Sequence, residues 1–201
     1  MVKDTFIHYH NLLTQEKFEI VSKISNSELT KTQGSQEAGK TICLDKTIKF
    51  NWDSYKGCWF SEAYEIDDFI PYWHPQFIYL VRQQQSKLQE LLKRECKCWH
   101  LRLYIHNDGV EWHRHYPPKD VKLEDCYLCV YYLHPNWDTK YGGALKVGTD
   151  ENNITHKFDC LSNSLVGHTS EYGHMVNDVV KGFKGDRMVF LTFWILGDHL
   201  A

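Results

Sequence analysis

Residues 130–147 read VYYLHPNWDTKYGGALKV, and this stretch decides the fold because it joins two apolar runs through a segment of turn formers. The pattern extends outward from Trp99 to the end of the chain, with short apolar or alternating runs separated by turn signals at NDG, PPKD, DENN and KGFKG. Several short strands at this spacing are typical of a β-sandwich or barrel. We therefore predict that residues 99–201 form antiparallel strands.

The N-terminal residues indicate first a helix and then a loop. Thr14 is suited to cap a helix that runs through Ile24, because apolar residues recur at helical spacing between residues 18 and 24. The polar stretch Asn26–Lys40 has no periodicity, so we predict a loop there. Residues 42–59 mix β-branched and aromatic residues with turn formers and indicate one or two strands.

A second helix is predicted before the strand-rich half begins. Pro75 stands where proline favours the first turn of a helix, and apolar residues continue along one side to about Arg94. Helices thus come first and antiparallel strands follow, which predicts a mainly β fold, a sandwich or jelly roll buttressed on one face by the helices. We predict one domain over residues 1–201, in which residues 1–98 support a core of residues 99–201.

Composition and charge argue against some classes of partner. The formal net charge of −3 gives no reason to expect a nucleic acid as partner. No apolar run reaches the length of a signal peptide or a membrane span, so we expect a soluble, cytoplasmic protein without a membrane partner. Seven scattered cysteines, an odd number, fit free thiols in a reducing compartment. The sequence leaves the oligomeric state open.

Two cysteine pairs raise the alternative of structural zinc: Cys96 with Cys98, and Cys126 with Cys129. The second pair lies in DCYLCVYYL, an apolar and aromatic run that predicts a buried strand. Structural zinc sites usually place such pairs in turns. Ordinary buried thiols are therefore the favoured interpretation.

Histidines in the C-terminal half form the first candidate site. If the WHRH segment, residues 112–115, is a strand, His113 and His115 point to the same face, because side chains alternate along a strand. Two imidazoles on one face can grip a metal, although an H-x-H arises easily by chance among twelve histidines. His174 would add a ligand from a distant strand and leave open positions, as in oxygen-activating iron sites. A surface loop histidine is the plain alternative.

Arg187, in GDRMVFLTFWIL, is the second candidate. On a strand it shares a face with the apolar residues at positions 189, 191, 193 and 195, which places a guanidinium on an apolar face. A buried charge needs an anion. That anion is either an internal carboxylate or a bound dicarboxylate, whose geometry the planar guanidinium matches. An arginine at the start of a strand can also extend its charge into solvent.

Together these features resemble the prolyl 4-hydroxylase-like branch of the iron(II)/2-oxoglutarate oxygenases, over roughly residues 99–196. Tyr104 precedes His113 by nine residues with a turn between them, as in the family's tyrosine, glycine-bearing turn and first metal histidine. VYYLHPNWD with GGAL is similar to the family's segment of paired tyrosines, Trp-Asp pair, double glycine and apolar strand. His174 is followed thirteen residues later by Arg187 and then by an apolar strand, which is similar to the family's closing motif.

The resemblance implies a double-stranded β-helix, a jelly roll of two antiparallel sheets with the metal at one open end. It implies an enzyme that uses Fe(II), the cosubstrate 2-oxoglutarate and O2 to hydroxylate a substrate, with release of succinate and CO2. That substrate is a peptide, at a prolyl or another amino-acid residue, or a small molecule. By position, His113 and His174 would bind iron and Arg187 would bind the distal carboxylate of 2-oxoglutarate. Three further residues would line the cosubstrate pocket: Tyr132, Tyr104 and Leu145.

One position departs from the family. The family's first motif is His-x-Asp or His-x-Glu, whereas the third ligand position here is His115. An all-histidine site is chemically feasible, because neutral imidazole suits iron, copper, nickel and zinc. We favour His115 as a metal ligand, in a catalytic site with His113 and His174; Asp108, Asp120, water or an anion are the alternatives. Three neutral imidazoles predict that metal affinity falls as the pH drops through roughly 6.5.

The same departure admits a rival function. A jelly-roll protein that has lost the carboxylate ligand can bind a metal or another ligand without catalysing oxygen chemistry. A zinc-type hydrolase fits less well, because no glutamate is obviously placed as a general base.

Overall fold

The structure is a computed structural model, and it describes residues 6–33, 42–44, 51–53, 58–60, 66–70, 73–105, 109–117, 121–180 and 186–197. The side chains of residues 28–33, 42–44, 51–53, 58–60, 68–69 and 104–105 lie outside the description. In chain order the elements are β1 Phe6–His10, α1 Gln15–Gln33, β2 Ile42–Leu44, β3 Asn51–Asp53, β4 Cys58–Phe60, α2 Pro75–Leu92, β5 Cys96–Ile105, β6 Val110–His113, β7 Cys126–Tyr132, β8 Leu145–Asp150, β9 Asn153–Phe158, β10 Ser164–Thr169, β11 Gly173–Val176 and β12 Met188–Leu196. Short 3-10 turns span Ile66–Phe69, Leu123–Asp125 and Thr139–Tyr141.

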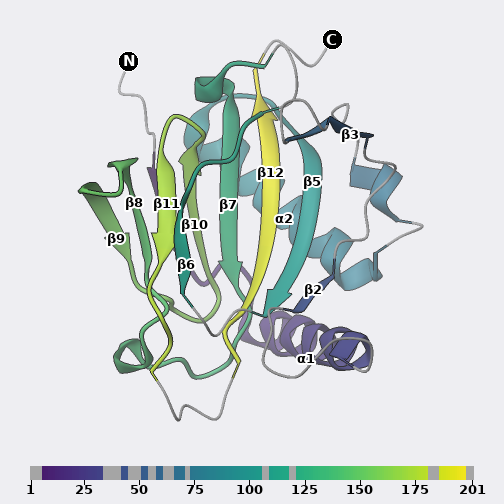
Figure 1. The fold of residues 1–201 in the computed structure, drawn as a ribbon. Coiled ribbons are helices and arrows are strands. Elements are labelled where there is room, and N and C mark those ends of the chain that lie inside the picture. Colours follow the sequence, from purple (N-terminus) through teal and green to yellow (C-terminus); the bar gives the residue numbers. More distant parts are fainter. Residues whose placement is uncertain are drawn as a thin grey trace.

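Two antiparallel sheets face each other (Figure 1). The larger has the strand order β1-β10-β7-β12-β5-β2, and the smaller has the order β6-β11-β8-β9. Strands β3 and β4 pair separately with each other. Apart from the hairpin of β8 and β9, neighbouring strands in both sheets are not consecutive in sequence, for example β7 between β10 and β12, as in a jelly roll. The predicted fold class, a mainly β jelly roll with N-terminal helices, is confirmed.

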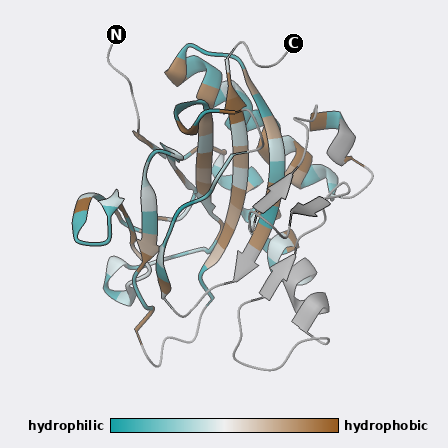
Figure 2. Ribbon diagram, turned by 45° about the horizontal axis from the view of Figure 1, so that its top comes forward, coloured by the Kyte–Doolittle hydropathy of each residue, from teal (hydrophilic) through white to brown (hydrophobic). Residues whose placement is uncertain are grey.

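The central strands of the larger sheet are apolar on both faces, because each face meets another layer. In β7 every residue is buried, and its side chains alternate. Tyr127, Cys129 and Tyr131 belong to the core on the helix side. Val130 and Tyr132 belong to the core between the sheets. Figure 2 shows the central strands as the brown, hydrophobic centre of the molecule.

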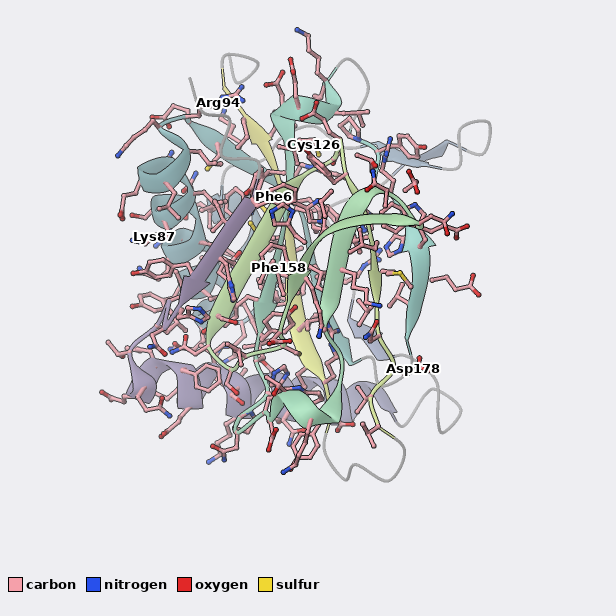
Figure 3. All side chains as sticks on the ribbon, turned by 90° about the vertical axis from the view of Figure 1, so that its left-hand side faces the viewer. Phe6, Lys87, Arg94, Cys126, Phe158 and Asp178 are labelled. Carbon is pink, nitrogen blue, oxygen red and sulfur yellow. The ribbon has the colours of Figure 1, made fainter. Side chains whose placement is uncertain are left out.

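The helices cover the outer face of the larger sheet, as the side view of Figure 3 shows for α2. Phe77 of α2 stacks on Phe190 of β12 with ring centroids 5.4 Å apart. Each buried side chain of this size contributes about 1.5–3 kcal/mol, so the helix is held mainly by this apolar contact. Both predicted helix starts are confirmed. The Oγ1 of Thr14 accepts from the backbone N–H of Lys17 at 3.4 Å, and Pro75 is the first residue of α2.

The N-terminal half differs from the sequence-based expectations in three places. α1 continues to Gln33, so the predicted loop over Asn26–Lys40 is wrong for residues 26–33, and residues 34–40 lie outside the described part. The segment 42–59 contributes to three short strands, β2, β3 and β4, instead of one or two. Strand β1 was not predicted at all, although Ile7 and Tyr9 alternate with His8 and His10 as an edge strand requires.

Phenylalanines close one open side of the jelly roll. Phe6 of β1 and Phe158 of β9 belong to different sheets, and their ring centroids lie 6.4 Å apart (Figure 3). The five cysteines whose side chains are described are buried and form no disulfide, and Cys126 and Cys129 both lie in the buried strand β7, as predicted. Among the described helices, none has the length and apolarity that a membrane span requires.

Candidate metal centre

The smaller sheet brings two distant histidines face to face. His113 ends β6 and His174 lies near the start of β11, and the two are directly opposite in the antiparallel pairing. Side chains in that relation lie on the same face with Cβ atoms about 5 Å apart. Their ring centroids are 4.3 Å apart. The register of the sheet therefore places the two imidazoles side by side on one face.

His115 joins this pair although β6 ends two residues before it. Its ring centroid lies 4.9 Å from that of His113 and 5.1 Å from that of His174. One potential ligand atom from each of the three lies within 4.8 Å of the others, and no other group of this kind occurs among the described residues. The convergence predicted from the sequence is present in the structure. That the three bind a metal remains a proposal.

Hydrogen bonds to the Nδ1 atoms orient two of the rings. The Nδ1 of His113 lies 2.9 Å from the backbone carbonyl oxygen of Glu111. A carbonyl only accepts, so this Nδ1 carries the proton and Nε2 keeps its lone pair. The Nδ1 of His174 lies 3.2 Å from the Nε2 of His168, a buried histidine that the sequence analysis missed. The feature that could have pointed to His168 is its position within the buried strand SLVGHT, where a histidine needs a hydrogen-bond partner.

Burial favours the neutral form of His115, His174 and His168. Desolvation lowers the pKa of His115 and of His174 well below the ordinary value of 6.5, and the neighbouring histidines lower both further. The same two causes act on His168, although its bond to Thr169 opposes them, and its pKa falls to about 4. Neutral imidazole is the form that coordinates a metal. A donor set of three imidazole nitrogens fits a first-row divalent metal such as Fe(II).

Arg187 lies just before β12, and it is buried at 2% exposure. Its Nε donates to the carbonyl oxygen of Gly143 at 3.0 Å. A Cβ at Gly143 would lie 2.9 Å from the Cδ of Arg187, and the φ of +71° there favours glycine. The double glycine thus lets the backbone approach the arginine closely enough to hold its Nε. The alternative in which Arg187 extends into solvent is wrong.

Tyr132 lies beside this arginine. The carbon at the centre of the Arg187 guanidinium is 5.4 Å from the centre of the tyrosine ring. The phenol oxygen is buried and makes no hydrogen bond of ordinary geometry. Burial raises the pKa of Tyr132, so the phenol stays protonated and able to donate. A buried cation and an unused buried donor side by side fit a carboxylate group.

One cavity joins the histidines to the arginine. It encloses about 70 Å³, and the three histidines, Arg187 and Leu145 line it together with Arg102 and a set of apolar side chains: Val110, Val130, Val176, Val189 and Leu191. Leu145 thus lies in the same cavity as the three histidines and Arg187. Tyr132 is not among the lining residues but lies beside Arg187. Arg102, which projects into the same space, was not predicted. A larger open hollow of about 1030 Å³ lies between α1 and residues 134–137, and none of the three histidines lines it.

The side chains of three further candidates lie outside the described residues. The side chain of Tyr104 lies outside the described residues, although its backbone is part of β5. Asp108 and Asp120, the alternatives to His115 as third ligand, also lie outside them. Among the described residues that line the cavity, no carboxylate is present.

The comparisons with known proteins agree with this geometry. Residues 99–196 match the family model described as the 2OG-Fe(II) oxygenase superfamily, which confirms the resemblance seen in the sequence. The cofactors that this family implies are Fe(II), 2-oxoglutarate and O2, as predicted. A comparison with curated protein sequences found no match.

Solved structures share the fold at low sequence identity. A prolyl-4-hydroxylase from Pseudomonas putida is 16% identical, with a TM-score of 0.54 over 96% of this chain and 93% of that one. A prolyl hydroxylase from Trichoplax adhaerens, in complex with a hypoxia inducible factor peptide fragment, is 18% identical, with a TM-score of 0.54 over 98% and 84%. HygX from Streptomyces hygroscopicus, with nickel and 2-oxoglutarate bound, is 9% identical, with a TM-score of 0.58 over 95% and 82%.

Proposed function

We propose that this chain, whose residues 99–196 belong to the 2OG-Fe(II) oxygenase superfamily, is an Fe(II)/2-oxoglutarate-dependent dioxygenase that hydroxylates its substrate. The observation that carries the proposal is the convergence of His113, His115 and His174 in one cavity with the buried Arg187. Three imidazoles gathered at one point lose solvation, and a guanidinium buried on an apolar face does the same. Both costs are offset when a cation and a dicarboxylate bind.

The residues of the site have separate roles in binding the metal and the cosubstrate. When bound, Fe(II) and 2-oxoglutarate supply the oxidative chemistry, in which O2 is consumed, succinate and CO2 are released and a substrate C–H bond is hydroxylated. His113, His115 and His174 hold the metal on one side and leave its remaining positions open. Arg187 and Tyr132 bind the distal carboxylate of the cosubstrate, and Leu145 packs against its chain. The apolar valines of the cavity exclude water from the reacting atoms.

His115 is the proposed third ligand. With an imidazole in place of the family's carboxylate, the metal keeps one more unit of positive charge. That charge strengthens the attraction for the dianionic cosubstrate. Because burial lowers the pKa of His115 and His174, protons compete with the metal at these two sites only at a pH below the 6.5 of a free imidazole.

A prolyl or other amino-acid residue is the proposed substrate class. The support is the fold shared with two prolyl hydroxylases, one of them solved with a peptide fragment. Fold alone does not determine a substrate, so a peptide library and free amino acids are both proper assays.

Succinate formation tests the function. The wild-type protein should release succinate only with Fe(II), O2 and 2-oxoglutarate together, and His174→Ala should abolish it. His156→Ala is the control, because His156 lies outside the candidate site and stacks on Phe6. A complementary test is the weak visible charge-transfer band expected on anaerobic addition of Fe(II) and 2-oxoglutarate. A normally folded protein that shows neither the band nor turnover is the non-catalytic binding protein instead.

A further inference from the structure

We propose that His168 is a positioning residue of the metal centre, which holds His174 in the one tautomer and orientation that direct its Nε2 toward the metal. The inference rests on the proposed metal site and extends it. His168 is no part of the histidine cluster that converges on the metal position, and the family motifs of the sequence did not single it out.

The two histidines belong to different sheets. His168 lies on β10 of the larger sheet, where its backbone pairs with Leu128 of β7 and Phe6 of β1. His174 lies on β11 of the smaller sheet. The rings cross the space between the sheets, with centroids 5.1 Å apart at 68°. His168 is 2% exposed and His174 is 5% exposed, so water does not substitute easily for either partner.

The protons of this pair follow from its hydrogen bonds. The Nδ1 of His168 lies 2.9 Å from the carbonyl oxygen of Thr169, which only accepts, so this Nδ1 donates. A neutral imidazole carries one proton, and the Nε2 of His168 is therefore an acceptor. It lies 3.2 Å from the Nδ1 of His174, which must then donate. The Nε2 of His174 is left with its lone pair, the atom that a metal needs.

Without this acceptor, His174 loses its orientation in two ways. The ring is free to take the other tautomer, whose Nε2 carries a proton and cannot coordinate. It is also free to tilt, because no hydrogen bond fixes its plane. Outer partners of this kind also raise the basicity of a ligand imidazole, and their removal typically costs 10- to 100-fold in metal affinity. The ring of His113 is oriented by a backbone carbonyl, which a substitution cannot remove. His168 is therefore the residue whose substitution can test whether an outer hydrogen bond controls metal affinity.

A merely structural histidine in the core would predict a different outcome. It would matter for the stability of the protein, not for metal affinity. The test therefore compares metal affinity with the stability of the metal-free protein in three variants. His168→Phe keeps a ring but has no acceptor, and His168→Gln restores an oxygen that can accept from His174. His134→Phe is the matched control, because His134 is also 2% exposed but bonds the carbonyl oxygen of Cys160.

Titration with Co(II), without 2-oxoglutarate, gives the affinities. We expect His168→Phe to lose roughly 10- to 100-fold in affinity. His168→Gln should recover most of it, and His134→Phe should bind as the wild type does. If wild type and His168→Phe bind equally, the role of His168 is overturned while the metal site stands. If the wild type binds no Co(II), the metal site fails and this inference fails with it.

A second measurement does not depend on any variant. In NMR spectra of the Co(II)-loaded wild-type protein, protons near the metal shift far from their ordinary positions. The Nδ1–H of His174 should appear among them and should exchange slowly with D2O, because it is buried and bonded to His168. An Nδ1–H of His174 that exchanges rapidly would overturn the proposal.

Discussion

At the scale of single residues, the proposed cosubstrate end of the site is built around Arg187 and Gly143. Arg187 is buried beside Tyr132, and its Nε is held by the carbonyl of Gly143. The space for this contact exists because Gly143 has no side chain. A charge placed so rigidly is suited to a ligand of fixed length and opposite charge, since little side-chain freedom is lost when the ligand binds.

Replacing this arginine should raise the cosubstrate requirement. In Arg187→Gln the distal carboxylate loses charge-assisted hydrogen bonds worth about 1.5–3 kcal/mol each. The 2-oxoglutarate concentration for half-maximal succinate formation should therefore rise about 10- to 100-fold, with Co(II) affinity unchanged. Arg114→Gln is the control, because Arg114 lies between the two histidines in sequence but bonds the carbonyl of Thr149. An unchanged 2-oxoglutarate requirement in Arg187→Gln would remove Arg187 from the cosubstrate site.

At the scale of elements, a buried chain of hydrogen bonds connects α2 to β12. The Oγ1 of Thr192 donates to the Oε1 of Gln84 at 2.6 Å and accepts from the Nε1 of Trp194 at 2.8 Å. Both hydrogen bonds are buried between the helix and the larger sheet. This chain gives α2 one register on β12, and β12 begins one residue after Arg187.

Loss of that hydroxyl should destabilise the protein. Thr192→Val keeps the shape of the side chain but leaves the side-chain Oε1 of Gln84 and the indole N–H of Trp194 buried without these partners. Unsatisfied groups of this kind cost about 1–3 kcal/mol each, so the free energy of unfolding should fall by at least about 2 kcal/mol. Urea unfolding measures it, with Thr139→Val, on an exposed turn, as control. Equal stability of Thr192→Val and wild type would show that these bonds contribute nothing net.

Elements with a strong local pattern could be predicted from the sequence. Strands such as β7 and β12 could be predicted from their long apolar runs, which arise because both faces of each strand pack against other layers. The end of α1 could not be predicted in this way, because residues 26–33 have no apolar residues at helical spacing. The absence of a helix breaker before Gly34 was the better guide. His113, His174 and Arg187 were found through their motifs. His168 was not, because its partner His174 is a neighbour only across two sheets.

At the scale of the whole molecule, the site exists only when the two sheets pack together. The smaller sheet supplies His113 and His174, and the larger sheet supplies Tyr132 and the strand that Arg187 precedes. Metal and cosubstrate binding should therefore stabilise the whole fold, since a ligand that binds only the folded chain adds its binding free energy to stability.

Acid should unfold the metal-free protein through its buried histidines. Burial, the largest cause, lowers the pKa of His100 and of His134 to about 3 and that of His168 to about 4. Between pH 6.5 and about 4 the unfolded chain binds protons that the folded chain does not. The free energy of unfolding is therefore greatest above pH 6.5 and falls on acidification, by about 1.4 kcal/mol per pH unit for each such histidine.

Urea unfolding of the metal-free protein at pH 7.5, 5.5 and 4.5 measures this slope. His134→Phe removes one of these buried histidines and should reduce the slope between pH 5.5 and 4.5 by about 1.4 kcal/mol per pH unit. A stability that stays level from pH 7.5 to 4.5 would show that these imidazoles titrate alike in the folded and unfolded chain.

A crystal structure of the protein with Fe(II) and 2-oxoglutarate, grown without oxygen, tests the central claim most directly. It should show one metal ion bound by nitrogen atoms of His113, His115 and His174, with the distal carboxylate of the cosubstrate on Arg187 and Tyr132. A metal bound elsewhere, or Arg187 paired with a protein carboxylate while 2-oxoglutarate is absent from the cavity, would contradict it.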